Sequence, residues 1–214
     1  MRAYYLTSEQ WGLEAIKLRR LKLSLFNEMN DPFELLGVEL RTKKDRTEFH
    51  QLKEDMNQSI GALCFSRNWD NPVLWSHYGD RHRGLCLGFD LLDWTFPIRY
   101  QGKRLTEEIE KKLSGKNHET MGNRILTTKY RHWRYEDEVR MIVQLVHAVH
   151  ENNMYFLPFC KALRLREVIV GPRCDLGLQD LRRLVSPQDQ GVRLTKSRLA
   201  FRAYKVIKNR ASNQ

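Results

Sequence analysis

The chain has 214 residues, of which 41% are hydrophobic and 29% charged, a composition typical of a globular protein. No apolar run approaches the roughly 20 residues that a membrane-spanning helix needs, and the first residues, MRAYYLTSEQ, have no apolar signal core, so we expect no secretion by that route. We therefore expect a cytoplasmic protein without membrane contact, folded as one domain over residues 1–214.

The formal net charge of +11 is concentrated toward the C-terminus. Residues 161–214 contain 13 Lys and Arg against 4 Asp and Glu, a net of +9, whereas the first 160 residues contain 24 against 22, a net of +2. A face that binds nucleic acid or an anionic small molecule would produce this asymmetry. A solvated basic surface without a partner would produce it too.

The N-terminal third is predicted to contain a strand and two helices. Ala3–Leu6 has the pattern of a short strand, and Thr7 with Gln10 predicts a capping box for the helix that follows. That helix is expected to end near Leu23 and to bury the stripe Trp11, Ala15 and Leu18. A second helix is predicted over Lys44–Gln58, with Phe49, Leu52 and Met56 facing inward.

The remainder of the chain is rich in strands. The predicted strands are Gly61–Ser66, Leu85–Phe89, Pro97–Tyr100, Asp137–Val146, Met154–Phe159, Val168–Val170, 192–199 and 201–207. Helices are predicted over 105–127, broken near Gly115, and over Leu178–Val185. Because no regular βαβ alternation appears, we predict an α+β fold of mixed, mainly antiparallel small sheets flanked by helices.

The first of three polar segments is Asn30-Asp31-Pro32-Phe33-Glu34. Asn and Asp before proline favour a turn in which their side chains cap backbone amides. Two carboxylates and an amide within five residues also suit the lining of a binding site. Both interpretations remain open at this point.

The second polar segment is Cys64-Phe65-Ser66 together with Trp75-Ser76-His77-Tyr78-Gly79-Asp80 and His82. Trp75, Tyr78 and His82 would share one face if the stretch were helical. The aromatic residues are either core residues or a surface on which a nucleobase or nicotinamide stacks. Cys64 and Cys86 are predicted to be small core residues.

The third polar segment is Trp133-Arg134-Tyr135-Glu136-Asp137-Glu138-Val139-Arg140. In an extended chain Glu136, Glu138 and Arg140 project from one face. They form either a solvent-facing ion-paired edge or a site in which a carboxylate orients a sugar hydroxyl and stabilises an oxocarbenium ion.

Other motifs have little support. His147-x-x-His150 lacks a third ligand at useful spacing, so we expect no metal. A Ser66–His77–Asp80 triad lacks the G-x-S-x-G elbow. Neither a phosphate-binding loop nor a G-x-G-x-x-G fingerprint is present.

With these segments in view, the chain resembles a bacterial family known as domain of unknown function 2971. The resemblance covers about residues 4–175, leaving 176–214 as a basic C-terminal region. It rests on the three polar segments, with His82-x-Gly84, Phe89, Lys129 and Val168-Ile169-Val170-Gly171. It favours a site at all three segments, but the family implies no particular activity.

The layout is more remotely similar to the ADP-ribosyltransferase superfamily. That similarity implies an early strand that grips NAD, a middle strand that ends in Ser or Thr, and a late strand that bears a catalytic glutamate. By position these would carry Tyr5, Ser66 and Glu136 or Glu138, with Tyr78 or Trp75 stacked on nicotinamide. The early strand departs from the superfamily, because apart from Arg2 it has neither Arg nor His.

Together the resemblances imply an NAD-consuming transferase or glycohydrolase effector, a toxin or phage-defence protein with NAD as substrate. The implied catalytic residues are Glu138, Glu136 and Ser66, and the implied binding residues are Tyr5, Asn30, Asp31, Glu34, Trp75, His77, Tyr78, His82, Lys129, Trp133 and Arg140. The expected partners are nucleic acid at the basic C-terminal region and a protein of a defence or toxin–antitoxin system.

Two other functions stay open. One is a nucleic-acid-binding protein or metal-dependent nuclease, with a divalent ion at Asp31, Glu34, Glu136 and Glu138. The other is a non-catalytic nucleotide sensor, which would be stabilised by its ligand without turnover.

Overall fold

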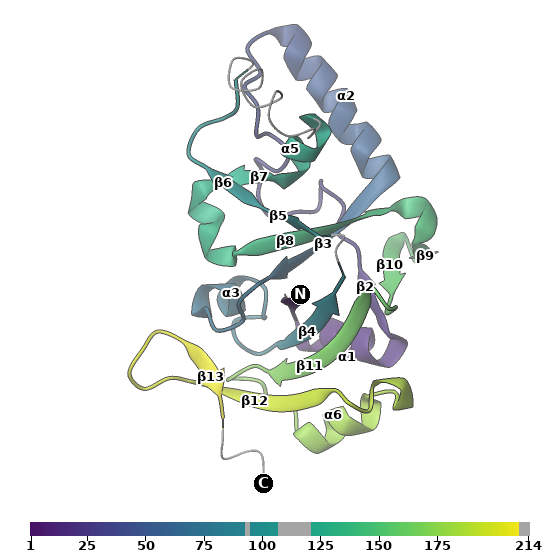
Figure 1. Ribbon diagram of the computed structural model, residues 1–214, viewed down its shortest axis with the longest axis vertical. Helices are drawn as coiled ribbons and strands as arrows, with labels where there is room; N and C mark the ends of the chain where they lie inside the picture. Colours follow the sequence, from purple (N-terminus) through teal and green to yellow (C-terminus); the bar gives the residue numbers. More distant parts are fainter. Residues whose placement is uncertain (93–94, 107–120, 210–214) are drawn as a thin grey trace.

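The computed structural model describes residues 1–92, 95–106 and 121–209, and its largest element is an eight-stranded mixed sheet (Figure 1). From one edge to the other its strands are β13 (Val206–Lys208), β12 (Arg193–Leu199), β11 (Leu163–Val170), β4 (Leu85–Leu91), β1 (Arg2–Thr7), β3 (Ile60–Ser66), β8 (Glu138–Gln144) and β5 (Phe96–Pro97). Neighbouring strands are antiparallel except β11 and β12, which are parallel.

Two small sheets and several helices surround the main sheet. The small sheets are β2 (Arg20–Lys22), β10 (Met154–Pro158) and β9 (Val149–Glu151), and the pair β6 (Arg99–Gln101) and β7 (Thr128–Tyr130). The α-helices are α1 (Glu9–Leu18), α2 (Lys43–Ser59), α3 (Pro72–His77), α5 (Met121–Thr127) and α6 (Leu178–Leu184). The 3-10 helices are η1 (Arg131–Glu136), η2 (Leu145–His147) and η3 (Pro187–Asp189). The predicted α+β class with mainly antiparallel sheets is confirmed.

The main sheet opens between β1 and β3. These neighbours are in register at a single pair, Tyr4 opposite Ser66. By contrast, β1 pairs with β4 along its whole length, and β3 pairs with β8 along its whole length. In Figure 1, β3 and β8 therefore diverge from β4 and β11. The opening leaves the ends of β1 and β3 free to border a pocket.

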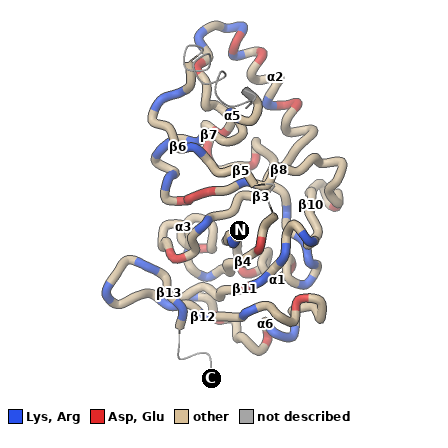
Figure 2. The backbone as a smooth tube through the Cα atoms, viewed as in Figure 1, with Lys and Arg blue, Asp and Glu red and all other residues tan. Residues whose placement is uncertain are grey.

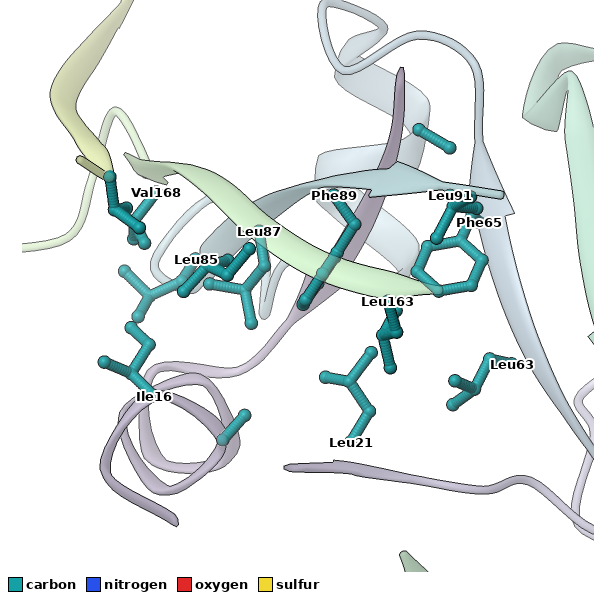
Figure 3. Packing of buried hydrophobic residues seen from close by; sticks show 14 of the residues in the cluster. Ile16, Leu21, Leu63, Phe65, Leu85, Leu87, Phe89, Leu91, Leu163 and Val168 are labelled. Atoms are coloured by element: carbon teal, nitrogen blue, oxygen red, sulfur yellow. The ribbon is translucent and has the colours of Figure 1, made fainter. Parts of the chain in front are cut away.

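The apolar core lies between β4, β11 and helices α1 and α6. In Figure 3, alternate residues Leu85, Leu87 and Phe89 of β4 point toward the side on which Ile16 of α1 lies. The opposite face of β4 is also covered, because Cys86 packs with Trp75 in a separate cluster. Burial on both faces explains why this strand is a nearly continuous apolar run.

The first helix begins and ends at other residues than predicted. Ser8, not Thr7, caps it, with the Ser8 hydroxyl accepting a hydrogen bond from the amide of Trp11. The helix stops at Leu18 because Arg19 adopts a left-handed conformation with φ 51°. The stretch predicted to continue to Leu23 alternates buried and partly exposed residues, and it forms β2 against β10.

The predicted stripe on that helix is wrong in two positions. Trp11 and Leu18 are exposed, and the buried residues are Gly12, Ala15 and Ile16. Gly12 faces the sheet because a Cβ there would lie 2.7 Å from Leu85 Cδ1. Helix–sheet contact therefore selects the side that carries the smallest residues.

The second helix closely matches its predicted range, and Thr42 with Asp45 forms its capping box. Phe49 is buried and Met56 packs against the same cluster as predicted, but Leu52 is 39% exposed. The helix covers only a small core, so its inward stripe is narrower than the sequence pattern indicates.

The segment after β3 contains only a short helix. α3 ends at His77, and Asp80, Arg81 and His82 all have positive φ. The predicted shared helical face of Trp75, Tyr78 and His82 is therefore wrong, because the chain turns before His82.

Other differences concern element boundaries. The strand predicted over Pro97–Tyr100 is divided between β5 and β6, which belong to different sheets, and β11 begins five residues before Val168. The predicted strand 201–207 survives only as Val206–Lys208, preceded by a loop. The sequence predicts a helix over 105–127 with a break near Gly115. Residues 107–120, which include that break, lie outside the described residues, and Met121–Thr127 is helical. No helix in the described ranges is long and apolar enough to cross a membrane.

Candidate functional site

A pocket of about 240 Å³ lies where the main sheet opens. Strands β1, β3 and β8 and the residues after β2 and α3 contribute to its wall. Eight residues predicted for the site line it: Tyr5, Asn30, Ser66, Tyr78, Lys129, Glu136, Glu138 and Arg140. The fold thus brings parts of all three polar segments together.

Arg140 is the centre of the charged cluster, by which we mean Glu34, Lys129, Glu136, Glu138 and Arg140. Its guanidinium has no exposed surface and donates to both carboxylate oxygens of Glu34, at 2.6 and 3.0 Å. Its Nε donates to Glu138 Oε1 at 2.6 Å, and a further N–H donates to the carbonyl of Leu126 at 3.0 Å. Arginine suits this position because its planar fork matches two carboxylates at once.

Lys129 joins the two glutamates Glu136 and Glu138. Its Nζ lies 2.5 Å from Glu136 Oε2 and 3.1 Å from Glu138 Oε2, and it is also 4.8 Å from the ring centre of Trp133. All three charged residues are at least nine-tenths buried. The interpretation of Glu136 and Glu138 as a solvent-facing ion-paired edge is therefore wrong.

Tyr78 completes the network on the pocket side. Its hydroxyl donates to Glu136 Oε1 at 2.5 Å, and the Asn30 side-chain amide donates to the same hydroxyl at 3.1 Å. A chain of hydrogen bonds thus leads from Asn30 through Tyr78 to Glu136 and Lys129. Burial and the neighbouring Glu136 carboxylate raise the pKa of Tyr78, so the phenol stays protonated as a donor.

The backbone between the two glutamates is bent rather than extended. Glu136 ends η1, and Asp137 is left-handed with φ 44°, a conformation that Asp tolerates better than most residues. The Asp137 carboxylate accepts from Arg67 at 3.1 Å and from Asn68 at 2.8 Å. This anchored turn directs Glu136 and Glu138 toward the same lysine.

The two glutamates differ in their protonation. Burial disfavours the charge on Glu138, but Arg140 and Lys129 outweigh it and lower the pKa to about 2. Burial raises the pKa of Glu136, an effect that the single cation Lys129 only partly offsets. Glu138 is therefore a fixed anion, whereas Glu136 is the carboxylate better suited to exchange a proton.

Ser66 and Tyr5 border the pocket from the opened strands. The Ser66 hydroxyl accepts a hydrogen bond from the amide of Asn68 at 3.1 Å, which leaves its own proton available to a ligand. Tyr5 packs edge-on against Phe65, with ring centres 5.9 Å apart. Tyr5 lies in the middle of β1, and Ser66 is the last residue of β3.

Six predicted binding residues do not line this pocket, namely Asp31, Glu34, Trp75, His77, His82 and Trp133. Trp75 has no exposed surface and its indole donates to the carbonyl of Trp69, so it cannot stack on a ligand. His77 is exposed and its Nδ1 lies 2.9 Å from the hydroxyl of Tyr135. Trp133 lies behind Lys129, and His82 lies in the left-handed turn after α3.

The first polar segment serves both interpretations. The Asp31 carboxylate accepts from the amide of Phe33 at 2.9 Å, which is the turn-capping role. Glu34, three residues on, holds Arg140 from behind the pocket. One residue shapes the turn and the other supports the site.

Several residues of the pocket were not predicted. Ser24, Glu28 and Met29 come from the stretch between β2 and Asn30, and Tyr4 comes from β1. Tyr100 supports the site from β6, because its hydroxyl accepts a hydrogen bond from the amide of Glu138 at 2.7 Å. The only sequence signal for the first group is proximity to Asn30, and none marks Tyr100.

The two glycines of the resemblance have a structural role. A Cβ on Gly84 would lie 2.0 Å from the Thr7 carbonyl oxygen, and one on Gly171 would lie 2.4 Å from that of His82. The Gly171 amide donates to the Gly84 carbonyl at 3.0 Å. Close approach of three backbones therefore requires glycine at both positions.

Within the described residues no group of three or more His, Cys, Asp or Glu has the arrangement of a metal site. The carboxylates that a divalent ion would use are held by other groups. Glu34 and Glu138 contact Arg140, and Asp31 contacts a backbone amide.

Comparison of the chain with protein-family models, with curated proteins and with solved structures gave no match. The resemblances to domain 2971 and to ADP-ribosyltransferases therefore remain predictions from the sequence.

Proposed function

We propose that the chain breaks the glycosidic bond of NAD, as an ADP-ribosyltransferase-like enzyme or NAD glycohydrolase of the domain 2971 type. The observation that carries the proposal is the pocket at the sheet opening, where Glu136, Glu138, Tyr78 and Ser66 meet. Tyr5, Ser66 and Glu138 come from β1, β3 and β8, which are neighbours in the main sheet.

The charge of the site suits this chemistry. Three carboxylates face two cationic side chains in the charged cluster, so one negative charge is in excess. Loss of nicotinamide leaves positive charge on the ribose, and a buried anion stabilises such charge more strongly than water does. Glu138, held ionised at a pKa of about 2, is the source of that stabilisation.

The proposed reaction proceeds as follows. The bond between ribose C1′ and the nicotinamide nitrogen breaks, and its electron pair neutralises the departing pyridinium. Water or a nucleophile of a target attacks C1′ and releases its proton to Glu136, whose raised pKa suits a base. Of the aromatic residues that line the pocket, Tyr78 is the one that we assign to contact nicotinamide. At about 240 Å³ the pocket is smaller than the range of about 300–1,000 Å³ for drug-sized ligands, so it suits the nicotinamide and its ribose better than a whole dinucleotide.

The test is nicotinamide release from NAD by the purified protein, with and without mixed RNA and DNA. Glu138→Gln and Glu136→Gln should each lower the rate at least about 100-fold, the size of effect seen when one electrostatic partner of a transition state is removed. Asp90→Asn is the matched control, because Asp90 pairs with Arg2 and Arg166 outside the pocket. Undiminished release by both glutamine variants, or none by the native protein, would refute the proposal.

A nucleotide sensor is the second candidate, and one observation favours it. The carboxylates of Glu136 and Glu138 are already hydrogen-bonded on all four oxygens. A site so fully paired within itself can recognise a ligand without reacting. ADP-ribose or NAD would then raise the melting temperature without nicotinamide release.

We propose in addition that the basic C-terminal region contacts nucleic acid, the expected target or partner. EDTA distinguishes this proposal from a metal-dependent nuclease. It would abolish nucleic-acid cleavage by a carboxylate-bound metal and leave NAD breakdown unchanged. The effector role in phage defence or a toxin–antitoxin system, with its partner protein, belongs to this same proposal.

A further inference from the structure

The loop between β12 and β13 holds two aromatic side chains in water. Phe201 is 91% exposed and Tyr204 is 98% exposed. Single exposed apolar residues are ordinary on protein surfaces. Two aromatic rings within four residues, at the tip of one hairpin, instead indicate a surface that binds a partner.

The loop is held in a defined conformation. The Ala200 amide donates to the Lys205 carbonyl at 2.9 Å, and Lys205 Nζ lies 2.7 Å from Asp70 Oδ2. Val206, at the base, has no exposed surface and packs with Trp75. Figure 1 shows the loop projecting from the edge of the main sheet, so the rings are presented outward by a fixed backbone.

The tip is also basic. Residues 198–208 contain four Lys and Arg and no Asp or Glu, and Figure 2 shows the positive charge along the hairpin. Lys205 and Lys208 are paired with Asp70 and Glu167. In the described part of the chain Arg198 and Arg202 have no carboxylate partner, and Arg198 lies 4.7 Å from the ring centre of Phe201.

We propose that this tip binds single-stranded nucleic acid, with bases stacked on Phe201 and Tyr204 and phosphates against Arg198 and Arg202. Aromatic faces interleaved with cations are the means by which proteins bind single strands without reading sequence. Unpaired bases offer the faces that such stacking needs, whereas the bases of a duplex are already stacked. A stable protein partner would need about 800 Å² on this side, more than a narrow hairpin tip supplies.

The inference rests on the proposed contact with nucleic acid but not on the NAD chemistry. The tip lies outside the pocket at the sheet opening, and none of its residues lines that pocket. The two proposals can therefore fail separately.

The experiment measures binding of the whole protein to fluorescent oligonucleotides of about 12 nucleotides, as single strands and as duplex. The double variant Phe201→Leu/Tyr204→Leu keeps apolar side chains but removes both ring faces. It should bind the single strand at least about tenfold more weakly, since each stacked ring contributes about 1–3 kcal/mol and 1.4 kcal/mol is tenfold. Tyr204→Phe retains the ring and should bind like the native protein.

Separate variants test the contribution of charge to binding and the integrity of the fold. Arg202→Gln should reduce the slope of log affinity against log salt by about 0.7, the value for one phosphate contact on a single strand. Val146→Ala alters another exposed apolar residue, 81% exposed and away from the hairpin, and should change nothing. The melting temperature and the NAD breakdown of the leucine variant should equal those of the native protein.

Each other outcome overturns a defined part of the proposal. If the leucine variant binds the single strand as well as the native protein does, the tip has no role and nucleic acid contacts another surface. If the native protein binds no oligonucleotide, both the role of the tip and the contact with nucleic acid are overturned. If the native protein prefers the duplex, the ligand is a duplex and not a single strand. If it binds phosphatidylcholine–phosphatidylserine vesicles through the rings and does not bind oligonucleotides, the ligand is a lipid surface.

Discussion

The molecule has two buried regions of opposite chemistry on either side of the opening in its main sheet. The apolar core around β4 and β11 contains side chains such as Leu85, Leu87 and Phe89, which are stabilised simply by leaving water. The charged cluster is buried just as deeply, with Arg140 fully enclosed. Burying charges costs free energy that ion pairing barely offsets. A protein that needed only stability would have no reason to keep the cluster, so we attribute it to the function of the pocket.

The two regions also differ in how well they tolerate the loss of a side chain. A truncation in the apolar core removes favourable contacts and leaves a cavity. Removal of one partner from the charged cluster leaves another charge buried without compensation, which costs more than the pair contributed. The following predictions test this difference, from the largest expected effect to the smallest.

Arg140→Met should have the largest effect on stability. The variant leaves Glu34 and Glu138 facing each other without their shared cation, and loss of one partner of a buried pair costs about 3–5 kcal/mol. Urea denaturation measures the loss. Arg2→Met is the matched control, because Arg2 pairs with Asp90 at the surface and should change stability by less than about 1 kcal/mol. Equal losses in both variants would contradict the contrast between the regions.

Leu87→Ala should cost slightly less, about 3 kcal/mol, because a fully buried side chain is replaced by a cavity. The loss should be the same at pH 6 and pH 3, since no charge is involved. A strong change of this loss with pH would mean that the core and the cluster are coupled.

The charged cluster should make stability depend on pH. The pKa of Glu138 is about 2 in the folded protein, against an ordinary value of 4.5. Its stabilisation is therefore complete above about pH 4.5 and is lost as the pH falls toward 2, a change of about 3 kcal/mol. Glu136 acts in the opposite direction, because its raised pKa favours folding as the pH falls.

Urea denaturation between pH 6 and pH 2 of the native protein and of Glu138→Gln measures this contribution. The variant should lose most of the acid sensitivity that Glu138 causes. An unchanged pH profile would show that Arg140 and Lys129 do not stabilise the Glu138 anion as the geometry indicates.

Tyr78→Phe should have the smallest effect, about 1.5–3 kcal/mol, since one hydrogen bond to a charged group is lost. Because the Tyr78 hydroxyl lowers the pKa of Glu136, removing it should raise that pKa further. NMR of the Glu136 carboxylate measures this pKa. Tyr135→Phe is the control, because the hydroxyl that it removes contacts His77. A Glu136 pKa that stays constant in Tyr78→Phe would remove Tyr78 from the proton network.

Local patterns were enough to predict much of the fold. Strand β3 follows from a short apolar run, and helix α2 from the periodicity of its apolar residues. Errors came where a local signal competed with a tertiary one. The residues after Leu18 have alternating burial, and pairing with β10 makes them a strand rather than the end of a helix.

For the site, the sequence determined which residue types were available: Glu136, Glu138 and Arg140 at alternate positions, with Asn30 and Glu34 in a proline turn. Only the tertiary structure decided how they are used. Glu34 contacts Arg140 across 106 positions of the chain, and Tyr78 contacts Glu136 across 58. Such contacts depend on how strands from distant segments pair, which no local period encodes. The same reason explains why Trp75 lies in the core while Tyr78, three residues later, lines the pocket.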